Sequence, residues 1–120
     1  LNSISPYLGK GDDIDTITFI PNSLDGKSSY PKYKNKICNG LKIRNLEDPI
    51  IWTLYLLEVL ENIYPNNFQF LDSNFIDKLY GDNILRLVIR EGGSVVTLIE
   101  AWEKKEKKFY EMSKKYYLYP

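Results

Sequence analysis

The chain has 120 residues, 16 Lys and Arg against 16 Asp and Glu, and 43% hydrophobic residues. This length suits one domain, and the apolar fraction is enough to bury a core. The balanced charge argues against binding nucleic acid or anionic lipid through a strong positive field. No His is present, which excludes His-based triads, imidazole acid–base catalysis and His–metal sites within the chain.

Cysteine content and hydropathy further limit the classes of protein to which this chain can belong. Cys38 is the sole Cys, so no internal disulfide framework exists. The start at Leu1 shows no basic segment followed by an apolar one, so no signal peptide is expected. The longest apolar run, around residues 49–60, is too short to span a membrane and contains Glu58. We expect a soluble chain with no membrane span, and leave open that it is a piece of a longer protein.

The N-terminal part predicts two strands. Residues 1–13 are typical of a linker or entry segment, because Pro, Gly and Asp gather there. β-branched and aromatic residues predict a strand over 15–20, ended by Pro21. A polar loop with a turn at Asp25 and Gly26 follows, and a second strand is predicted over 37–43.

The middle of the chain predicts a helix over residues 49–64. Asp48 is a good N-cap, Pro49 is tolerated in the first turn, and Pro65 stops the helix. Apolar residues nearly encircle this segment. Such a pattern is typical of a helix buried on most sides, so we expect it to be the central core element.

The C-terminal part predicts short elements and then a long helix. Alternation over 67–72 indicates a short strand or extended segment. Ser73, Asp82 and Ser94 are candidate caps for three successive helices. The last helix carries an apolar stripe of Val95, Leu98, Ile99, Trp102, Phe109, Met112 and Tyr116. The predicted class is α+β: a small N-terminal sheet, one buried central helix, several short helices and a longer C-terminal amphipathic helix.

Two sets of residues are candidates for catalytic or anion-binding groups. A glycosidase needs two carboxyls at a defined separation, and carboxyls cluster at residues 12–15 and at Glu58 and Glu61. Helix capping and solvation are the simpler explanation for each. Gly92 and Gly93 before a helix are better explained as a turn than as an anion site. We therefore predict no catalytic residue and no metal site in this chain, and no cofactor.

The loop before the second strand holds the remaining candidates, Lys32, Tyr33, Cys38 and Asn39. A nucleophilic Cys38 is disfavoured, because no His is available to activate it. Tyr and Lys together offer an apolar face, a hydroxyl and three donors, a combination that suits sugars and peptides. Gly40 allows a close backbone approach or a positive φ. From the residues alone, an ordinary turn and strand start is favoured over a binding wall, and both remain open.

The order of several motifs resembles a known family. FIP (19–21) precedes KYKNKICNGLKI (32–43), then LENIYPNNFQF (60–70), then FIDKLYG (75–81) and a tail ending in YYLY. Together these are similar to the C-terminal domain of the NamZ exo-β-N-acetylmuramidases, over residues 14–119. The chain departs from the family pattern in four places: a longer loop after Pro21, Asn35 in place of a Gly, Leu41 in place of a Val, and an Asp after Phe75 that comes one residue late, at Asp77.

The resemblance implies a function for the whole protein. Members are two-domain enzymes of peptidoglycan turnover that release N-acetylmuramic acid from the non-reducing end of glycan fragments. A Rossmann-like N-terminal domain carries the catalytic carboxylate, and the smaller domain helps to form the cleft. Residues 14–120 would be this auxiliary domain. Its partners would be the catalytic domain and a peptidoglycan-derived saccharide, in a secreted, periplasmic or cell-envelope setting, with Lys32, Tyr33, Cys38 and Asn39 as the cleft-facing wall.

Two rival interpretations remain. A non-catalytic glycan-binding or interaction domain could use the aromatic residues of the tail, Tyr116, Tyr117 and Tyr119. Their exposure to solvent would favour this reading, because binding sites for carbohydrates use exposed planar rings whereas core aromatics are buried. A purely structural domain is the third interpretation.

Overall fold

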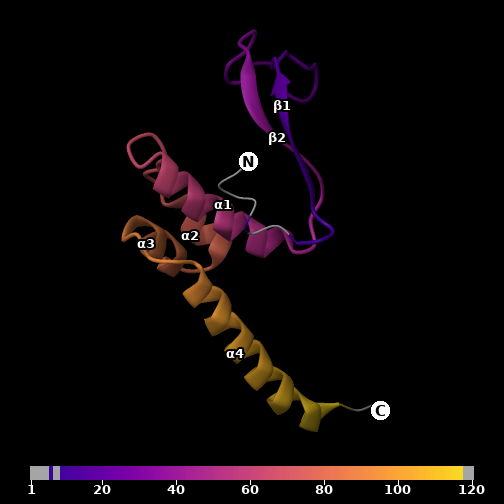
Figure 1. Cartoon of the computed structure of the whole chain (residues 1–120). Coiled ribbons are helices and arrows are strands. Elements are labelled where there is room, and N and C mark those ends of the chain that lie inside the picture. Colours follow the sequence, from indigo (N-terminus) through magenta and orange to yellow (C-terminus); the bar gives the residue numbers. More distant parts are fainter. Residues whose placement is uncertain (1–5, 7–8, 118–120) are drawn as a thin grey trace. The chain divides into compact units, whose positions relative to one another are not determined.

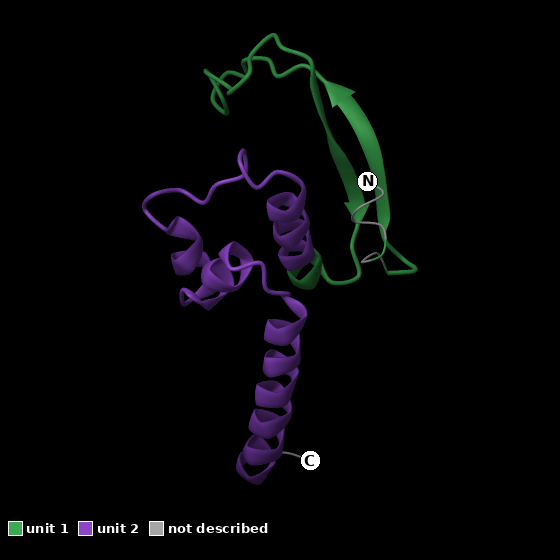
Figure 2. Cartoon of the chain, turned by 60° about the vertical axis from the view of Figure 1, so that its left-hand side comes forward, with its two compact units in different colours: residues 1–52 green, residues 53–120 purple. Residues whose placement is uncertain are grey.

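The structure is a computed structural model that describes residue 6 and residues 9–117. The chain divides into two compact units, Leu1–Trp52 and Thr53–Pro120 (Figures 1 and 2). Within the described residues from 9 onward, two strands precede four α-helices and a short 3-10 turn, which confirms the predicted α+β class. No helix within the described ranges combines the length and apolar character needed to cross a membrane.

The first unit is built on a β-hairpin. Strands β1 (Asp13–Phe19) and β2 (Cys38–Asn45) pair antiparallel in a two-stranded sheet. Both predicted strands form, each displaced by one or two residues from its expected bounds. Arg44 joins the strands, with an ion pair of 2.6 Å from its Nη1 to Oδ1 of Asp13 and a second pair to the Asp15 carboxylate. Two of the clustered carboxylates thus serve cross-strand pairing.

Helix α1 (Pro49–Ile63) follows the hairpin and begins where the cap residue predicted. Oδ1 of Asp48 accepts hydrogen bonds of 3.0 Å from the backbone N–H groups of Ile50 and Ile51, which satisfies donors that have no partner within the helix. Burial is greatest at Trp52 and Leu54 and lowest at the ends, where Ile50 and Ile63 are exposed.

The second unit gathers the later helices around a small core. Its helices are α2 (Phe75–Tyr80), α3 (Ile84–Arg90) and α4 (Val96–Ser113), followed by the 3-10 turn η2 (Lys114–Tyr116). The described buried hydrophobic side chains of this unit are Leu54, Leu85, Ile89, Val95, Leu98 and Ile99. The first two turns of α4 therefore contribute its packed side, whereas the rest of the predicted stripe, Phe109, Met112 and Tyr116, is exposed.

An ion pair joins α2 to α3. Nε and Nη2 of Arg86 donate to the two carboxylate oxygens of Asp77, at 2.9 and 2.7 Å. This bidentate geometry holds the pKa of the Asp77 carboxyl below its ordinary value, because hydrogen bonds from a guanidinium favour the charged form. The neighbouring short helices are thereby tied by a polar contact as well as by apolar packing.

The structure of residues 67–74 differs in part from expectation. Of the two alternatives for 67–72, the strand does not form, because no second strand lies beside it to pair its backbone groups, and residues 68–71 belong to neither a helix nor a strand. The chain turns instead, with the N–H groups of Asn67 and Phe68 bonding to the carbonyl of Tyr64. Ser73 does not cap α2: Asn74 takes that place with a φ of 50°, in the left-handed region that Asn tolerates.

The other two predicted caps act close to their expected places. Oδ1 of Asp82 accepts from the N–H of Ile84 at 2.8 Å, at the start of α3. At the start of α4, Oγ of Ser94 accepts a hydrogen bond from the N–H of Val96 at 3.3 Å. A shorter bond comes from Glu58, whose Oε2 accepts from the N–H of Val95 at 2.7 Å. The helix start is therefore capped mainly by a residue 37 positions earlier in the chain.

Candidate functional site

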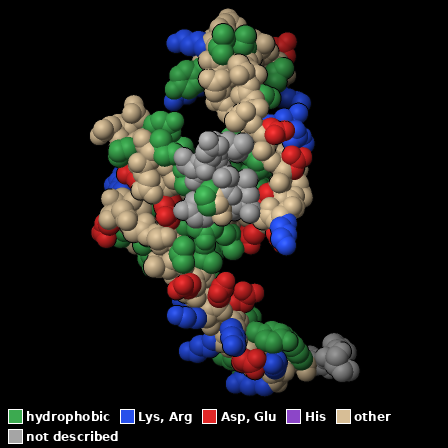
Figure 3. Space-filling view, viewed as in Figure 1, with side chains coloured by type: hydrophobic (Ala, Val, Ile, Leu, Met, Phe, Trp, Pro, Cys, Tyr) green, Lys and Arg blue, Asp and Glu red, His purple; other side chains and the backbone are tan. Residues whose placement is uncertain are grey.

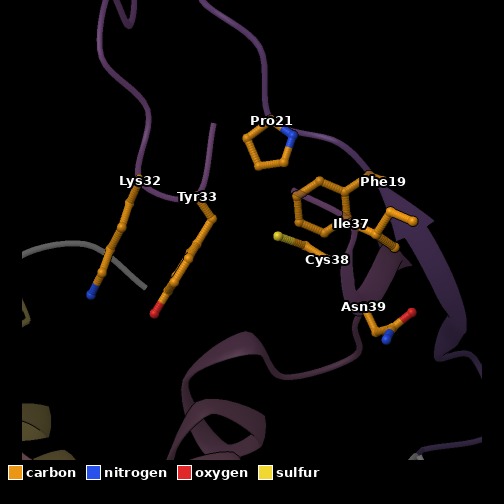
Figure 4. Close-up of a pocket in the computed structure, with 7 residues that line it drawn as sticks. All are labelled: Phe19, Pro21, Lys32, Tyr33, Ile37, Cys38 and Asn39. Atoms are coloured by element: carbon orange, nitrogen blue, oxygen red, sulfur yellow. The ribbon is translucent and has the colours of Figure 1, made fainter. Parts of the chain in front are cut away.

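A pocket of about 500 Å³ lies at the loop end of the β-hairpin (Figure 4). The pairing of Phe19 with Cys38 ends the sheet there, and the long connecting loop begins. Both strand ends and the last part of the loop contribute side chains. The lining residues are Phe19, Pro21, Lys32, Tyr33, Ile37, Cys38 and Asn39.

Gly40 leaves room for the ring of Phe19 to lie close against the sheet. A Cβ atom at residue 40 would lie 3.2 Å from Cε1 of Phe19, closer than ordinary van der Waals contact. The φ of Gly40 is not in the left-handed region, since the positive-φ glycines are at residues 26, 81 and 92. Of the two roles expected for this glycine, the structure supports close approach. The missing side chain lets Phe19 lie over the neighbouring strand and form one side of the pocket.

The loop that carries Lys32 and Tyr33 has a constrained backbone. Tyr33 and Asn35 both have a φ of 60°. Asn35 stands where the family pattern has Gly, and its left-handed conformation agrees with that correspondence. Its N–H bonds to the carbonyl of Pro21 at 3.0 Å, which ties the loop to the end of β1. A bulky residue such as Tyr33 in this conformation is a strained position of the kind that gathers at binding sites.

The polar groups of the pocket come from both sides. Lys32 and Tyr33 extend side by side from the loop, with Nζ of Lys32 5.3 Å from the centroid of the Tyr33 ring (Figure 4). Across from them, the Cys38 thiol donates a weak hydrogen bond to the carbonyl of Lys36 at 3.6 Å. Asn39 lies at the edge and its side chain points away from Lys32 and Tyr33 (Figure 4), where its Oδ1 accepts from Oγ1 of Thr18 at 3.0 Å.

The structure thus brings the predicted residues Lys32, Tyr33, Cys38 and Asn39 to one pocket. Sequence reasoning missed the apolar lining residues, which are Phe19, Pro21 and Ile37. The signal that could have found them is the antiparallel hairpin, because pairing the end of one strand with the start of the next places Phe19 beside Cys38. Their contribution is a hydrophobic wall facing the Tyr33 side.

The side chains of the pocket are suited to binding a ligand and not to catalysis. Its seven described lining residues include a cation, a phenol, an amide and a thiol, and no Asp or Glu. The arrangement can bind an anionic or hydroxylated ligand with an apolar face. It holds no pair of carboxyls for acid–base hydrolysis of a glycoside. Among residues 6 and 9–117, no group of three or more His, Cys, Asp or Glu is placed to hold a metal ion.

Two smaller cavities have simpler explanations. One of about 180 Å³ is bordered by three carboxylates, those of Asp12, Glu47 and Asp48, and Asp12 and Asp48 already accept backbone hydrogen bonds. The other, of about 230 Å³ in the second unit, is lined chiefly by Leu and Phe side chains. It offers no charged group to orient a ligand. The hairpin pocket is therefore the strongest candidate.

Comparison with known families shows to which family the chain belongs. Residues 7–119 match the family described as "Exo-beta-N-acetylmuramidase NamZ, C-terminal". The chain belongs to this family. The match covers nearly all of the sequence, including the hairpin pocket and all four helices. It agrees with the resemblance found in the order of the motifs.

A named relative supports the NamZ assignment. The chain is 28% identical over 95 residues to "Peptidoglycan beta-N-acetylmuramidase NamZ" of Bacillus subtilis (strain 168). The aligned part is 76% of this chain and 23% of the relative, so the chain spans about a quarter of the relative's length. No solved structure matches the chain.

Proposed function

We propose that this chain is the auxiliary C-terminal domain of an exo-β-N-acetylmuramidase. In the intact protein, the hairpin pocket forms one wall of the substrate cleft, and an N-terminal domain supplies the catalytic carboxylate and the rest of the cleft. The enzyme releases N-acetylmuramic acid from the non-reducing end of peptidoglycan fragments. The observation that carries this proposal is the convergence of Lys32, Tyr33, Cys38 and Asn39 on one pocket in a chain of the NamZ family.

The chemistry of N-acetylmuramic acid fits the groups in this pocket. The sugar carries a lactyl carboxylate, an acetamido group and a ring with an apolar face. The ammonium of Lys32 suits the carboxylate, and the ring of Tyr33, 57% exposed, suits the sugar face. Binding and orientation come from this domain, while bond cleavage comes from the other.

Two assays with a chromogenic β-N-acetylmuramide test the proposal. The 120-residue chain alone should release no product, and activity there would overturn the claim that it carries no catalytic set. In the intact protein, Tyr33→Ala should lower kcat/KM by roughly fivefold through the loss of one stacked ring, which is worth about 1 kcal/mol. Tyr30→Ala is the matched control, because Tyr30 is an exposed loop tyrosine that does not line the pocket. Unchanged kinetics in Tyr33→Ala would remove this residue from the cleft wall.

A second candidate function is glycan binding by the tail. Tyr116 and Tyr117 are 69% and 60% exposed, which is the observation expected of a carbohydrate platform; Tyr119 lies outside the described residues. Under this alternative, the chain alone would bind a peptidoglycan oligosaccharide. Tyr116→Ala would abolish that binding, and Tyr33→Ala would leave it unchanged. Calorimetric titration of the two variants separates the two functions.

A further inference from the structure

The apolar stripe of α4 continues well beyond the part that the second unit covers. Leu98 and Trp102 lie on the same helix face as Phe109, Met112 and Tyr116, because these residues recur at spacings of three, four or seven. We call Phe109, Met112 and Tyr116 the distal seam. The stripe is continuous in sequence from Leu98 to Tyr116. It would be buried along its whole length if a partner packed against the distal seam.

The two halves of the stripe differ sharply in burial. Leu98 is 8% exposed, and Trp102 stacks on Tyr80 with ring centroids 5.5 Å apart. Phe109, Met112 and Tyr116 are 64%, 50% and 69% exposed. Within the second unit, the distal part of α4 extends away from α2 and α3, with hydrophobic side chains showing among its charged ones (Figures 1 and 3). Three large apolar side chains in one row at a helix surface mark an interaction site.

The charged residues beside the distal seam indicate which kind of surface would bind there. Lys105 lies on the stripe itself, between Trp102 and Phe109, and Lys108 and Lys115 border it on one side. A second copy fits poorly. In an antiparallel pair, Lys108 and Lys115 would face each other, and in a parallel pair Lys105 would face its own equivalent. The seam suits a different surface, apolar at the centre with carboxylates along one edge.

The length of the relative leaves room for such a partner within the same protein. The chain spans 23% of the Bacillus subtilis relative and matches a family described as C-terminal, so about three quarters of that relative lies outside the match. We propose that the distal seam docks onto the N-terminal region of the intact protein, where acidic side chains meet Lys105, Lys108 and Lys115. This inference rests on the two-domain organisation in the proposed function, and it does not depend on which glycoside the protein cleaves.

Hydrogen exchange in the intact protein tests the docking. Phe109→Ser should speed amide exchange about tenfold in one patch of the N-terminal region and in residues 105–117, because the docked surface opens more often. Tyr110→Ser is the matched control, since this neighbouring tyrosine is 52% exposed and lies on another face of α4. Unchanged exchange at residues 97–101 in both variants shows that α4 still folds. Lys108→Glu should act in the same direction as Phe109→Ser, and Lys107→Glu, on the opposite face, should have no effect.

Three results would overturn the docking. The first is that amide exchange in the N-terminal region is the same in Phe109→Ser as in the wild type. The second is that the intact protein is a dimer that Phe109→Ser converts to a monomer, which would assign the seam to a second copy. Alternatively, a peptidoglycan oligosaccharide would protect residues 105–117 while Phe109→Ser left the N-terminal region unchanged, which assigns the seam to glycan. The exchange measurement needs no turnover. An intact protein without muramidase activity therefore refutes the proposed function and leaves the docking to be judged by its own result.

Discussion

The Glu58 carboxylate on α1 accepts a hydrogen bond of 2.7 Å from the backbone N–H of Val95, immediately before α4. Val95 is completely buried, so its N–H has no access to water and needs an acceptor from the protein. Ser94 adds a longer contact of 3.4 Å from its hydroxyl to the same carboxylate oxygen. One side chain of the central helix therefore fixes where the longest helix begins.

Replacing Glu58 should destabilise the second unit. Glu58→Ala leaves a buried donor without its partner and removes a helix cap, a change worth about 1 kcal/mol in the free energy of unfolding. Urea denaturation followed by circular dichroism measures it. Glu61→Ala is the matched control, because it removes the same kind of side chain from the same helix. Equal denaturation midpoints for the two variants would mean that the contact to Val95 contributes nothing.

The Asp77–Arg86 pair should make stability depend on acidic pH. The guanidinium of Arg86 lowers the pKa of Asp77 from its ordinary value of 3.8, so the unfolded chain binds this proton more readily than the folded one. The contribution of the pair is thus fully present well above pH 3.8 and is lost as pH falls through the lowered pKa of the folded state. The wild type should lose stability over this interval, in addition to the loss that its other carboxylates cause.

Asp77→Asn isolates that contribution. The variant should be less stable than the wild type at pH 7, and the difference in urea midpoint should shrink as the pH approaches 2. Asp72→Asn makes the same change of charge a few residues away and serves as the control. A difference between Asp77→Asn and the wild type that stays constant from pH 7 to pH 2 would contradict the role of the ion pair.

The left-handed backbone at Asn35 predicts a contrast between two substitutions. Asn35→Gly should change the free energy of unfolding by less than about 0.5 kcal/mol, because Gly adopts a φ of 60° freely but costs entropy in the unfolded chain. Asn35→Ala should destabilise by about 1 kcal/mol, since Ala pays the steric cost of this conformation. Lys34→Ala, next in sequence, is the control. Thermal unfolding of the three variants measures the order, and Ala equal to Gly at residue 35 would contradict it.

Local signals in the sequence predicted much of this fold. The Asp48 cap and Pro65 bracketed α1 because both act through the backbone of their own helix. The stripe of α4 appeared because helical periodicity is visible without knowing the partner. Asn35 was matched to a family Gly, and its φ of 60° agrees with that match. These features depend on residues a few positions apart.

Features that depend on distant residues were missed or wrong. The cap supplied by Glu58 joins residues 37 positions apart, so Ser94 seemed sufficient from sequence alone. The alternation at 67–72 predicts a short strand or an extended segment, and the strand does not form, because a strand needs a neighbour that the pattern does not show. The pocket wall of Phe19, Pro21 and Ile37 follows from the hairpin register, whereas Lys32 and Tyr33 were found because their side chains carry recognisable chemistry.

Recognition of the muramic acid carboxylate by Lys32 is the central claim, and one comparison of substrates tests it. Kinetics of the intact protein would be measured on a chromogenic β-N-acetylmuramide and on the same compound with its lactyl carboxyl amidated. Lys32→Gln should raise KM for the free acid by about two- to fivefold, as expected for an exposed ion pair, and leave KM for the amide unchanged. Lys34→Gln, in the same loop but outside the pocket, should alter neither value. Equal effects of Lys32→Gln on the acid and on the amide, or no effect on either, would contradict the placement of the substrate in this pocket.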